Sequence, residues 1–173
     1  MKNKPILIVL LLLIVQAFTP SCHSSYHQKK YMRKTYKKIR KKVKEAKVTK
    51  YNDTVKVSFP TNILFDKESY IISETVLPSI VRFAAALNKY DKTAILVSGF
   101  TDSLGTEEYN NNLSMMRAEM AKKTLVNNEV LPERINTWGM GERHPIASNE
   151  TEAGRAKNRR VEFVILYKEE KKK

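Results

Sequence analysis

The sequence lacks the residues on which disulfide-rich and many metal-dependent proteins depend. Its 173 residues include a single cysteine, Cys22, so no disulfide can form within the chain. The three histidines, His23, His27 and His144, stand in neither a metal-ligand spacing nor a Ser/His/Asp or Cys/His arrangement. We therefore predict no enzymatic activity, no metal and no cofactor.

Acidic residues are almost missing from the first 50 positions, where Glu45 is the only one. This segment has 14 of the 32 Lys and Arg residues and a charge of +13, whereas residues 51–173 carry only +1. A total of +14 would by itself favour nucleic acid or an anionic surface as the partner. Because the charge is confined to one end, the sequence predicts a nearly neutral domain behind a basic leader.

A long apolar run is also missing from the leader. The run at residues 5–18, interrupted only by Gln16, has about 14 residues, whereas a membrane-spanning helix needs about 20. It follows Lys2 and Lys4 and precedes small residues at 19–22, which is the pattern of a secretory signal. Since the run is short and contains no Asp or Glu, we do not expect an ion-coupled, stator-like motor subunit.

Cys22 stands directly after a small residue at the end of this run, as in bacterial lipoprotein signals. The resemblance implies that residues 1–21 are removed as a signal peptide and that Cys22 becomes the first residue of the mature protein, carrying acyl chains such as palmitate. Thr19 departs from that pattern, which prefers Leu three positions before the cysteine, and Pro20 is unusual there. The alternative is an ordinary cleaved signal with an incidental cysteine.

Residues 22–50 are expected to form a basic linker, since residues 23–50 alone carry +11. Five of its apolar residues recur at helical spacing: Met32, Tyr36, Ile39, Val43 and Ala46. The segment is therefore either a basic amphipathic helix lying on anionic lipid headgroups or a disordered spacer with accidental periodicity. Each Lys or Arg near such a surface contributes about 1 kcal/mol. We expect no nucleic-acid partner, because an exported protein seldom meets one.

Residues 51–167 are predicted to form one mixed α/β domain, followed by a solvated charged tail at residues 168–173. Apolar patterning predicts strands at 55–59, continued by 63–65, and at 94–100, 134–138 and 160–167, with helices at 74–89 and 111–128 and a loop at 139–158. The order β-α-β-α-β-loop-β indicates at least one parallel βαβ unit. The expected fold is an α+β or α/β sandwich, with a mixed sheet and two long helices on one face.

Four motifs carry a resemblance to a known family: GFTDSLG at 99–105, YNNNLSMMRA at 109–118, GMGE at 139–142 and GRAKNRRVE at 154–162. In this order and spacing they resemble the OmpA-type C-terminal domain, a peptidoglycan-binding module shared with peptidoglycan-associated lipoproteins and flagellar stator subunits. The resemblance covers residues 59–167. It implies a β/α sandwich that binds the diaminopimelate-containing stem peptide of peptidoglycan without catalysing a reaction.

The same motifs place an acid and a base where a zwitterionic ligand needs them. Asp102 follows the apolar strand, where α/β sheets commonly present ligand sites. Asn110 and Arg117 are seven residues apart and therefore project from one helix face. A free diaminopimelate end carries an ammonium and a carboxylate on one carbon, which Asp102 and Arg117 match. Asn110, at the helix start, offers a donor and an acceptor beside a terminus that favours anions.

By resemblance, Asp102 and Arg117 occupy the family's two principal ligand-contacting positions, and Asn110 matches a supporting contact. Thr101, Leu113 and Ser114 are expected to contribute to the wall or the backbone of the same site. The alternative is that Asp102 caps a turn and simply pairs with Arg117.

The sequence departs from the family pattern at two positions. Phe100 stands where the family usually has His, and Glu68 stands near the place where relatives often have a small polar residue. For Arg155, Arg159 and Arg160, a loop-closing or strand-edge role is expected rather than ligand contact.

The resulting prediction is a non-enzymatic envelope tether at the periplasmic face of the outer membrane. It would bind peptidoglycan non-covalently through the domain and hold the membrane through Cys22, aided by the basic segment 23–50. The alternative is a basic, membrane-surface envelope protein whose OmpA-like domain is structural or binds a protein partner, which the sequence does not identify.

Overall fold

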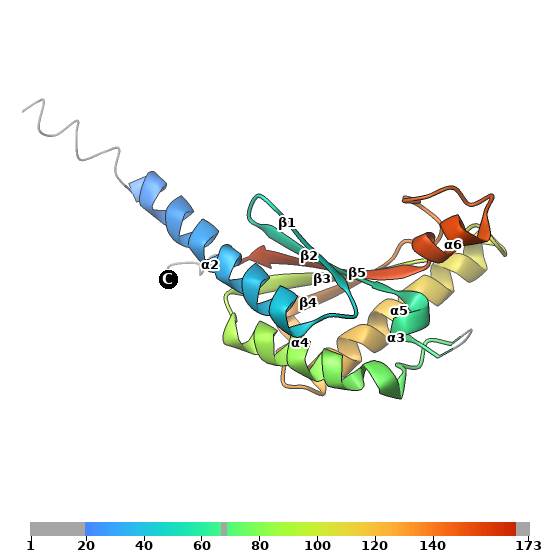
Figure 1. Cartoon of the computed structure of the whole chain (residues 1–173), viewed down its shortest axis with the longest axis horizontal. Helices are drawn as coiled ribbons and strands as arrows, with labels where there is room; N and C mark the ends of the chain where they lie inside the picture. Colours follow the sequence, from blue (N-terminus) through green and yellow to red (C-terminus); the bar gives the residue numbers. More distant parts are fainter. Residues whose placement is uncertain (1–19, 67–68, 169–173) are drawn as a thin grey trace, which may run out of the picture.

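The computed structural model describes residues 20–66 and 69–168, with side chains from residue 26 onward. The predicted signal segment, the lipidation of Cys22 and the side chain of Glu68 fall outside this described part. Within it, the chain forms a five-stranded sheet covered on one face by helices (Figure 1). The strands are β1 (Lys47–Tyr51), β2 (Thr54–Pro60), β3 (Thr93–Phe100), β4 (Ile135–Gly139) and β5 (Arg160–Tyr167).

The sheet is mixed, with the spatial order β1-β2-β5-β3-β4. All neighbouring strands are antiparallel except β3 and β4, which are parallel. The helix α5 (Glu107–Val126) connects these two strands and packs on both. The predicted parallel βαβ unit is therefore confirmed, and so is the mixed α/β fold.

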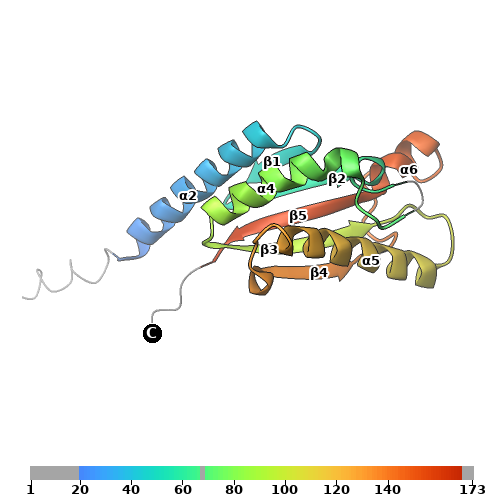
Figure 2. The same ribbon diagram turned by 90° about the horizontal axis from the view of Figure 1, so that it is seen from below.

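Three long helices lie side by side on one face of the sheet, one more than the sequence predicts (Figure 2). The two expected helices are α4 (Leu77–Lys89) and α5, and the third is α2 (Pro20–Lys42). Two shorter helices, α3 (Thr61–Leu64) and α6 (Glu152–Asn158), lie near the opposite end of the molecule from the start of α2. Short 3₁₀ turns occur at Glu74–Val76 and Pro132–Arg134.

The helix α2 is part of the domain. The apolar side chains of Met32 and Ile39, and of Val43 directly after the helix, are 0–1% exposed, because this part of the chain packs against α4, β1 and β2. The ring of Tyr31 makes edge-on contacts with the rings of Tyr90 and Tyr167. The apolar periodicity does mark a helix, as one interpretation expected, but its apolar face packs on the domain and not on lipid headgroups. The interpretation as a disordered spacer is wrong for residues 23–42.

The folded unit consequently begins before residue 51. Strand β1 pairs with β2 along its whole length, so the expected boundary between linker and domain lies inside the sheet. The buried apolar core is continuous from Met32 to Ile165, and its centre is a cluster of edge-packed rings from Phe59, Phe83 and Phe163. A fragment starting at residue 23 keeps this entire core.

Two predicted element boundaries are wrong, and both changes shape the site. Residues 61–64 form the helical turn α3 instead of continuing the strand, because Pro60 ends the ladder and Phe65 N donates to Thr61 O. Helix α5 begins at Glu107 rather than at 111. The hydroxyl of Thr106 accepts from Tyr109 N and caps the earlier start.

Candidate functional site

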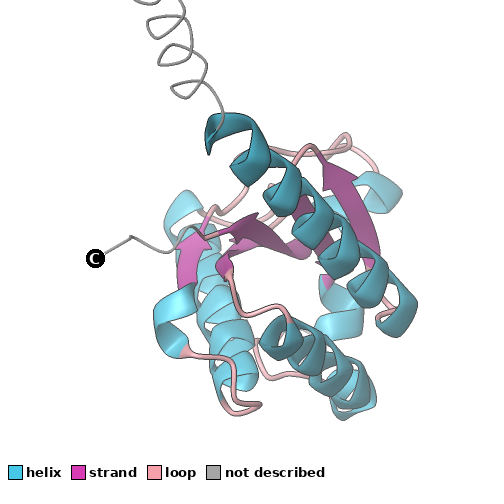
Figure 3. Ribbon diagram, turned by 90° about the vertical axis from the view of Figure 1, so that its left-hand side faces the viewer, coloured by secondary structure: helices cyan, strands magenta, loops and turns pink. Residues whose placement is uncertain are grey.

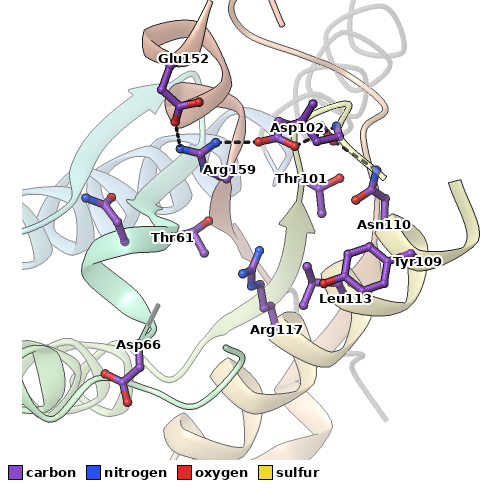
Figure 4. Close-up of a pocket in the computed structure, with 12 residues that line it drawn as sticks. Thr61, Asp66, Thr101, Asp102, Tyr109, Asn110, Leu113, Arg117, Glu152 and Arg159 are labelled. Atoms are coloured by element: carbon purple, nitrogen blue, oxygen red, sulfur yellow. Dashed lines mark hydrogen bonds and ion pairs between the residues drawn. The ribbon is translucent and has the colours of Figure 1, made fainter. Parts of the chain in front are cut away.

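A cavity of about 510 Å³ opens at the C-terminal end of β3 (Figure 4). Its walls come from α3, the loop after β3, the first three turns of α5, and α6 with the residue that follows it. The lining residues are Thr61, Asn62, Asp66, Thr101, Asp102, Leu104, Tyr109, Asn110, Leu113, Arg117, Glu152 and Arg159. The fold therefore brings five of the six predicted ligand-contacting residues to one cavity.

Asp102 is the buried acid of this cavity, with 6% of its surface exposed. Its Oδ1 accepts a hydrogen bond from Leu104 N, and its Oδ2 accepts one from Arg159 NH1 at 2.6 Å. The carboxylate therefore caps a turn, as the alternative interpretation expected, but its ion-pair partner is Arg159 rather than Arg117.

Arg117 is the buried base, and no described carboxylate lies within ion-pair distance of it. It is 5% exposed, and its Nε donates to Ser69 O at 3.1 Å. The guanidinium lies 5.6 Å from the ring centre of Phe65. Burial lowers the pKa of Arg117, and the nearby charge of Arg159 lowers it further. The cation is thus held in a poorly hydrated place, and none of the described carboxylates forms an ion pair with it.

Arg159 is a cavity residue that sequence reasoning assigned to a structural role. Besides Asp102, it pairs with Glu152 on α6. These hydrogen bonds raise the pKa of Arg159, chiefly through Glu152. The other two arginines of the motif do not line the cavity: Arg155 donates to loop carbonyls, and Arg160 pairs with Glu162 at 2.8 Å.

Two threonine hydroxyls in the cavity are buried without a hydrogen-bond partner. These are Thr101 Oγ1, in the predicted site, and Thr61 Oγ1, on α3. Buried polar atoms in proteins are rarely left unsatisfied, so such atoms mark places where a further group is accommodated. Asn110, by contrast, is satisfied: its Nδ2 donates to Glu142 Oε2 at 3.0 Å and to Asp102 O at 3.4 Å.

The prediction that Ser114 contributes to the cavity is wrong. Its side chain is fully buried, donates to Asn111 O and accepts from Gly141 N at 2.9 Å. It thereby fastens α5 to the loop after β4. Phe100 also lies outside the cavity lining, and its ring packs under the guanidinium of Arg160 at 3.7 Å.

The part of the chain that the structure describes contains no cluster of His, Cys, Asp and Glu side chains that is suited to a metal ion. The described helices also include none that is both long and apolar enough to cross a membrane.

This fold and cavity define a small binding module in which a buried acid and a buried base line one cavity. Residues 64–159, more than half of the chain, match the OmpA family. The chain belongs to this family.

Relatives and solved structures agree with that placement. The chain is 38% identical to "Probable lipoprotein YiaD" of Escherichia coli K12 over 118 residues, which are 68% of this chain and 54% of the relative. It is 43% identical to "Peptidoglycan-binding protein ArfA" of Mycobacterium bovis over 84 residues, 49% of this chain and 26% of the relative. The cell wall anchor of the T6SS from Pseudomonas aeruginosa has a similar structure, with a TM-score of 0.65, 30% identity and coverage of 72% and 89% of the two chains. The chain thus spans about half or less of these two curated relatives.

Proposed function

We propose that the chain is a non-enzymatic tether whose cavity binds the diaminopimelate end of a peptidoglycan stem peptide. The observation that carries the proposal is the buried guanidinium of Arg117, which has no anionic partner among the described residues and lies in one cavity with the buried carboxylate of Asp102. An ammonium and a carboxylate on the same carbon complement these two charges.

The energetics favour a charged ligand. A buried cation without a partner is costly, and a carboxylate that pairs with Arg117 bidentately removes that cost. The ligand ammonium joins Asp102 Oδ2, which already accepts from Arg159, since a carboxylate oxygen has two lone pairs. The orphan hydroxyls of Thr61 and Thr101 supply further polar contacts. The exposed apolar side chains of Leu104 and Tyr109 cover the ligand's methylene groups.

The names of relatives support this assignment. One relative is named as a peptidoglycan-binding protein, another as a lipoprotein, and a similar structure is described as a cell wall anchor. We carry these properties over to this chain as part of the proposal, together with residence at the periplasmic face of the outer membrane.

The arrangement of the molecule suits a tether. The start of α2, where Cys22 lies, is at one end of the molecule, and α3 and α6, which contribute residues to the cavity, are at the other (Figure 1). Acyl chains on Cys22 would therefore leave the cavity facing away from the membrane.

The test is a pull-down of fragment 23–173 with purified peptidoglycan sacculi of the diaminopimelate type. Asp102→Asn and Arg117→Gln are each expected to weaken binding by more than about a hundredfold, because each leaves one ligand charge unpaired at a cost of about 3–5 kcal/mol. Asp91→Asn and Arg40→Gln are the matched controls, since both positions are exposed and lie outside the cavity. Binding by both site variants at the parent level contradicts the assignment.

A second arm of this test concerns the ligand. A stem peptide with lysine in place of diaminopimelate keeps the side-chain ammonium but lacks the carboxylate beside it, so it is expected to compete poorly. Equal competition by the two peptides would show that Arg117 does not bind the diaminopimelate carboxylate.

A further inference from the structure

A second cavity, of about 670 Å³, lies between the N-terminal half of α2 and the turn that joins β1 to β2. Its lining residues are Tyr26, Lys29, Lys30, Arg33, Lys50, Asn52 and Asp53. Four of these seven side chains are cations and one is a carboxylate. We call this place the basic cleft. It is far from the Asp102 cavity and has no role in the proposed stem-peptide recognition.

The cations of the basic cleft are exposed and lack carboxylate partners. None of the ion pairs between described residues involves Lys29, Lys30 or Arg33, and α2 contains no acidic residue. Lys50 donates only to the turn carbonyl of Asn52. Converging Lys and Arg side chains bind oxyanions such as phosphate. In this cleft four cations face one carboxylate, Asp53, and no ion pair between described residues joins that carboxylate to them.

Aromatic side chains at the same end favour a lipid headgroup over a free anion. Tyr26, at the rim of the basic cleft, is 60% exposed, and Tyr51, beside the turn, is 80% exposed. Exposed Tyr rings are enriched at membrane–water interfaces, where their apolar body and polar tip are both accommodated. Cys22 precedes Tyr26 by one helical turn and Arg33 by three, so an acyl chain there would hold the α2 residues of the basic cleft within about 6–17 Å of the headgroups.

We propose that the basic cleft binds the phosphate of anionic phospholipid headgroups and fixes the domain's orientation on the membrane. This inference rests on the proposed function, because the anchor at Cys22 supplies the nearby membrane. The contact is electrostatic and peripheral. The apolar face of α2 is already buried in the domain, so binding involves no insertion of that face and no gain of helix. A basic amphipathic peptide that folds on a membrane would do both.

The experiment measures co-sedimentation of fragment 23–173, which lacks Cys22 and retains the whole core, with vesicles of phosphatidylglycerol mixed into phosphatidylcholine. Each Lys or Arg near such a surface increases the affinity for the vesicle roughly fivefold. The variant Lys29→Gln, Lys30→Gln, Arg33→Gln, Lys50→Gln is expected to lose about several hundredfold in affinity, since four such contributions multiply. The control Lys89→Gln, Lys122→Gln, Lys123→Gln, Lys157→Gln has the same change in charge on other elements and is expected to lose less than about threefold.

Substitution of Asp53 is expected to raise vesicle affinity, whereas substitution of the cations lowers it. Asp53 is the only carboxylate of the basic cleft, and Asn is well suited to its turn position. Asp53→Asn is therefore expected to raise vesicle affinity several-fold. Binding should fall steeply with salt in every case.

Four outcomes would overturn the proposal: equal losses in the cleft and control variants, equal binding to pure phosphatidylcholine, a rise in helix content on binding, or displacement by inorganic phosphate beyond that by chloride at equal ionic strength. The last would assign the cleft to a free anion. Because fragment 23–173 carries no lipid and vesicles hold no peptidoglycan, these outcomes are independent of the sacculus pull-down.

Discussion

Two arginines of this protein are equally buried but differ in how their hydrogen bonds are satisfied. Arg134 and Arg117 are each 5% exposed. The guanidinium of Arg134 donates to three backbone carbonyls and to the hydroxyl of Thr93. Arg117 makes one such bond, to Ser69 O. Burial lowers the pKa of both residues, because desolvation disfavours each charged guanidinium. Only in Arg134 do several hydrogen bonds within the protein offset this desolvation.

The first prediction follows from this difference. Arg134→Gln is expected to lower the free energy of unfolding by about 2–4 kcal/mol, because it leaves buried carbonyls without a donor. Arg117→Gln is expected to change it by less than about 1 kcal/mol, or to raise it, because it removes an unpaired buried charge. Urea unfolding of the two variants measures both effects. A loss in Arg117→Gln as large as that in Arg134→Gln would make Arg117 a structural residue.

The sequence predicts a site residue when the residue's position on a single strand or helix already places it at the site. Asp102 and Arg117 are recognisable because strand end and helix face fix their positions. Thr61 and Arg159 cannot be recognised in this way. Thr61 lies on the helical turn after β2, and Arg159 lies between α6 and β5 near the other end of the domain sequence, so only the fold brings them to the cavity. Ser114 fails for a different reason: a motif position does not reveal whether a side chain faces the cavity or the loop it fastens.

At the scale of elements, the close approach of α5 to β3 holds Arg117 and Asp102 in one cavity. Gly99 permits that approach, since a Cβ at this position would clash with the backbone carbonyl of Ser114. We expect Gly99→Ala to lower the free energy of unfolding by about 1–3 kcal/mol and to weaken sacculus binding in proportion to the displaced helix. Thermal unfolding and the pull-down measure the two effects. Ala at an exposed helical position, as in Lys123→Ala, is the control, and parent-like behaviour of Gly99→Ala would contradict the close approach.

The contact between the end of α2 and α4 makes a small, pH-dependent contribution to stability. Glu45 accepts from Ser79 Oγ and pairs with Arg82 at 3.3 Å, and Arg82 also donates to Lys42 O. The hydrogen bond from Ser79 is the main cause that lowers the pKa of Glu45. Because the folded pKa lies below the unfolded value, this stabilisation is complete above the unfolded pKa and is lost as the pH falls through the folded one.

The pH prediction is tested with Glu45→Gln. At about pH 7 the variant is expected to be less stable than the parent by no more than about 1 kcal/mol, since the pair is partly exposed and screened. At about pH 3 the difference should shrink, because the parent's Glu45 is then protonated as well. Urea unfolding at both pH values measures the difference between the two proteins, so other carboxylates cancel. A constant difference would contradict the role assigned to this carboxylate.

At the scale of the whole molecule, the sequence correctly predicts where the charge lies but not what the charged segment does. Counting residues separates a basic leader from a nearly neutral domain. Only packing reveals that the buried side chains of Met32 and Ile39 make α2 a third helix of that domain, because a helical stripe of apolar residues fits a membrane and a protein surface equally well. The segment expected to be a linker is thus a helix packed on the sheet, as the view from the start of α2 shows (Figure 3), and its start lies at the end of the molecule opposite α6 (Figure 1).

The last prediction separates a docked helix from a linker. Fragment 51–173 lacks α2 and nearly all of β1, and so loses the fully buried apolar side chains of Met32, Ile39 and Val43, which are worth on the order of 5 kcal/mol together. Since small domains have only about 5–15 kcal/mol in total, we expect this fragment to melt far below fragment 23–173 or to aggregate. Fragment 29–173 keeps every α2 residue that the structure describes as buried and should match fragment 23–173. In fragment 23–173, Met32→Ala with Ile39→Ala should reproduce most of the loss. Equal melting temperatures for fragments 51–173 and 23–173 would mean that α2 contributes no stability, and the segment would then serve only as a spacer between membrane and domain.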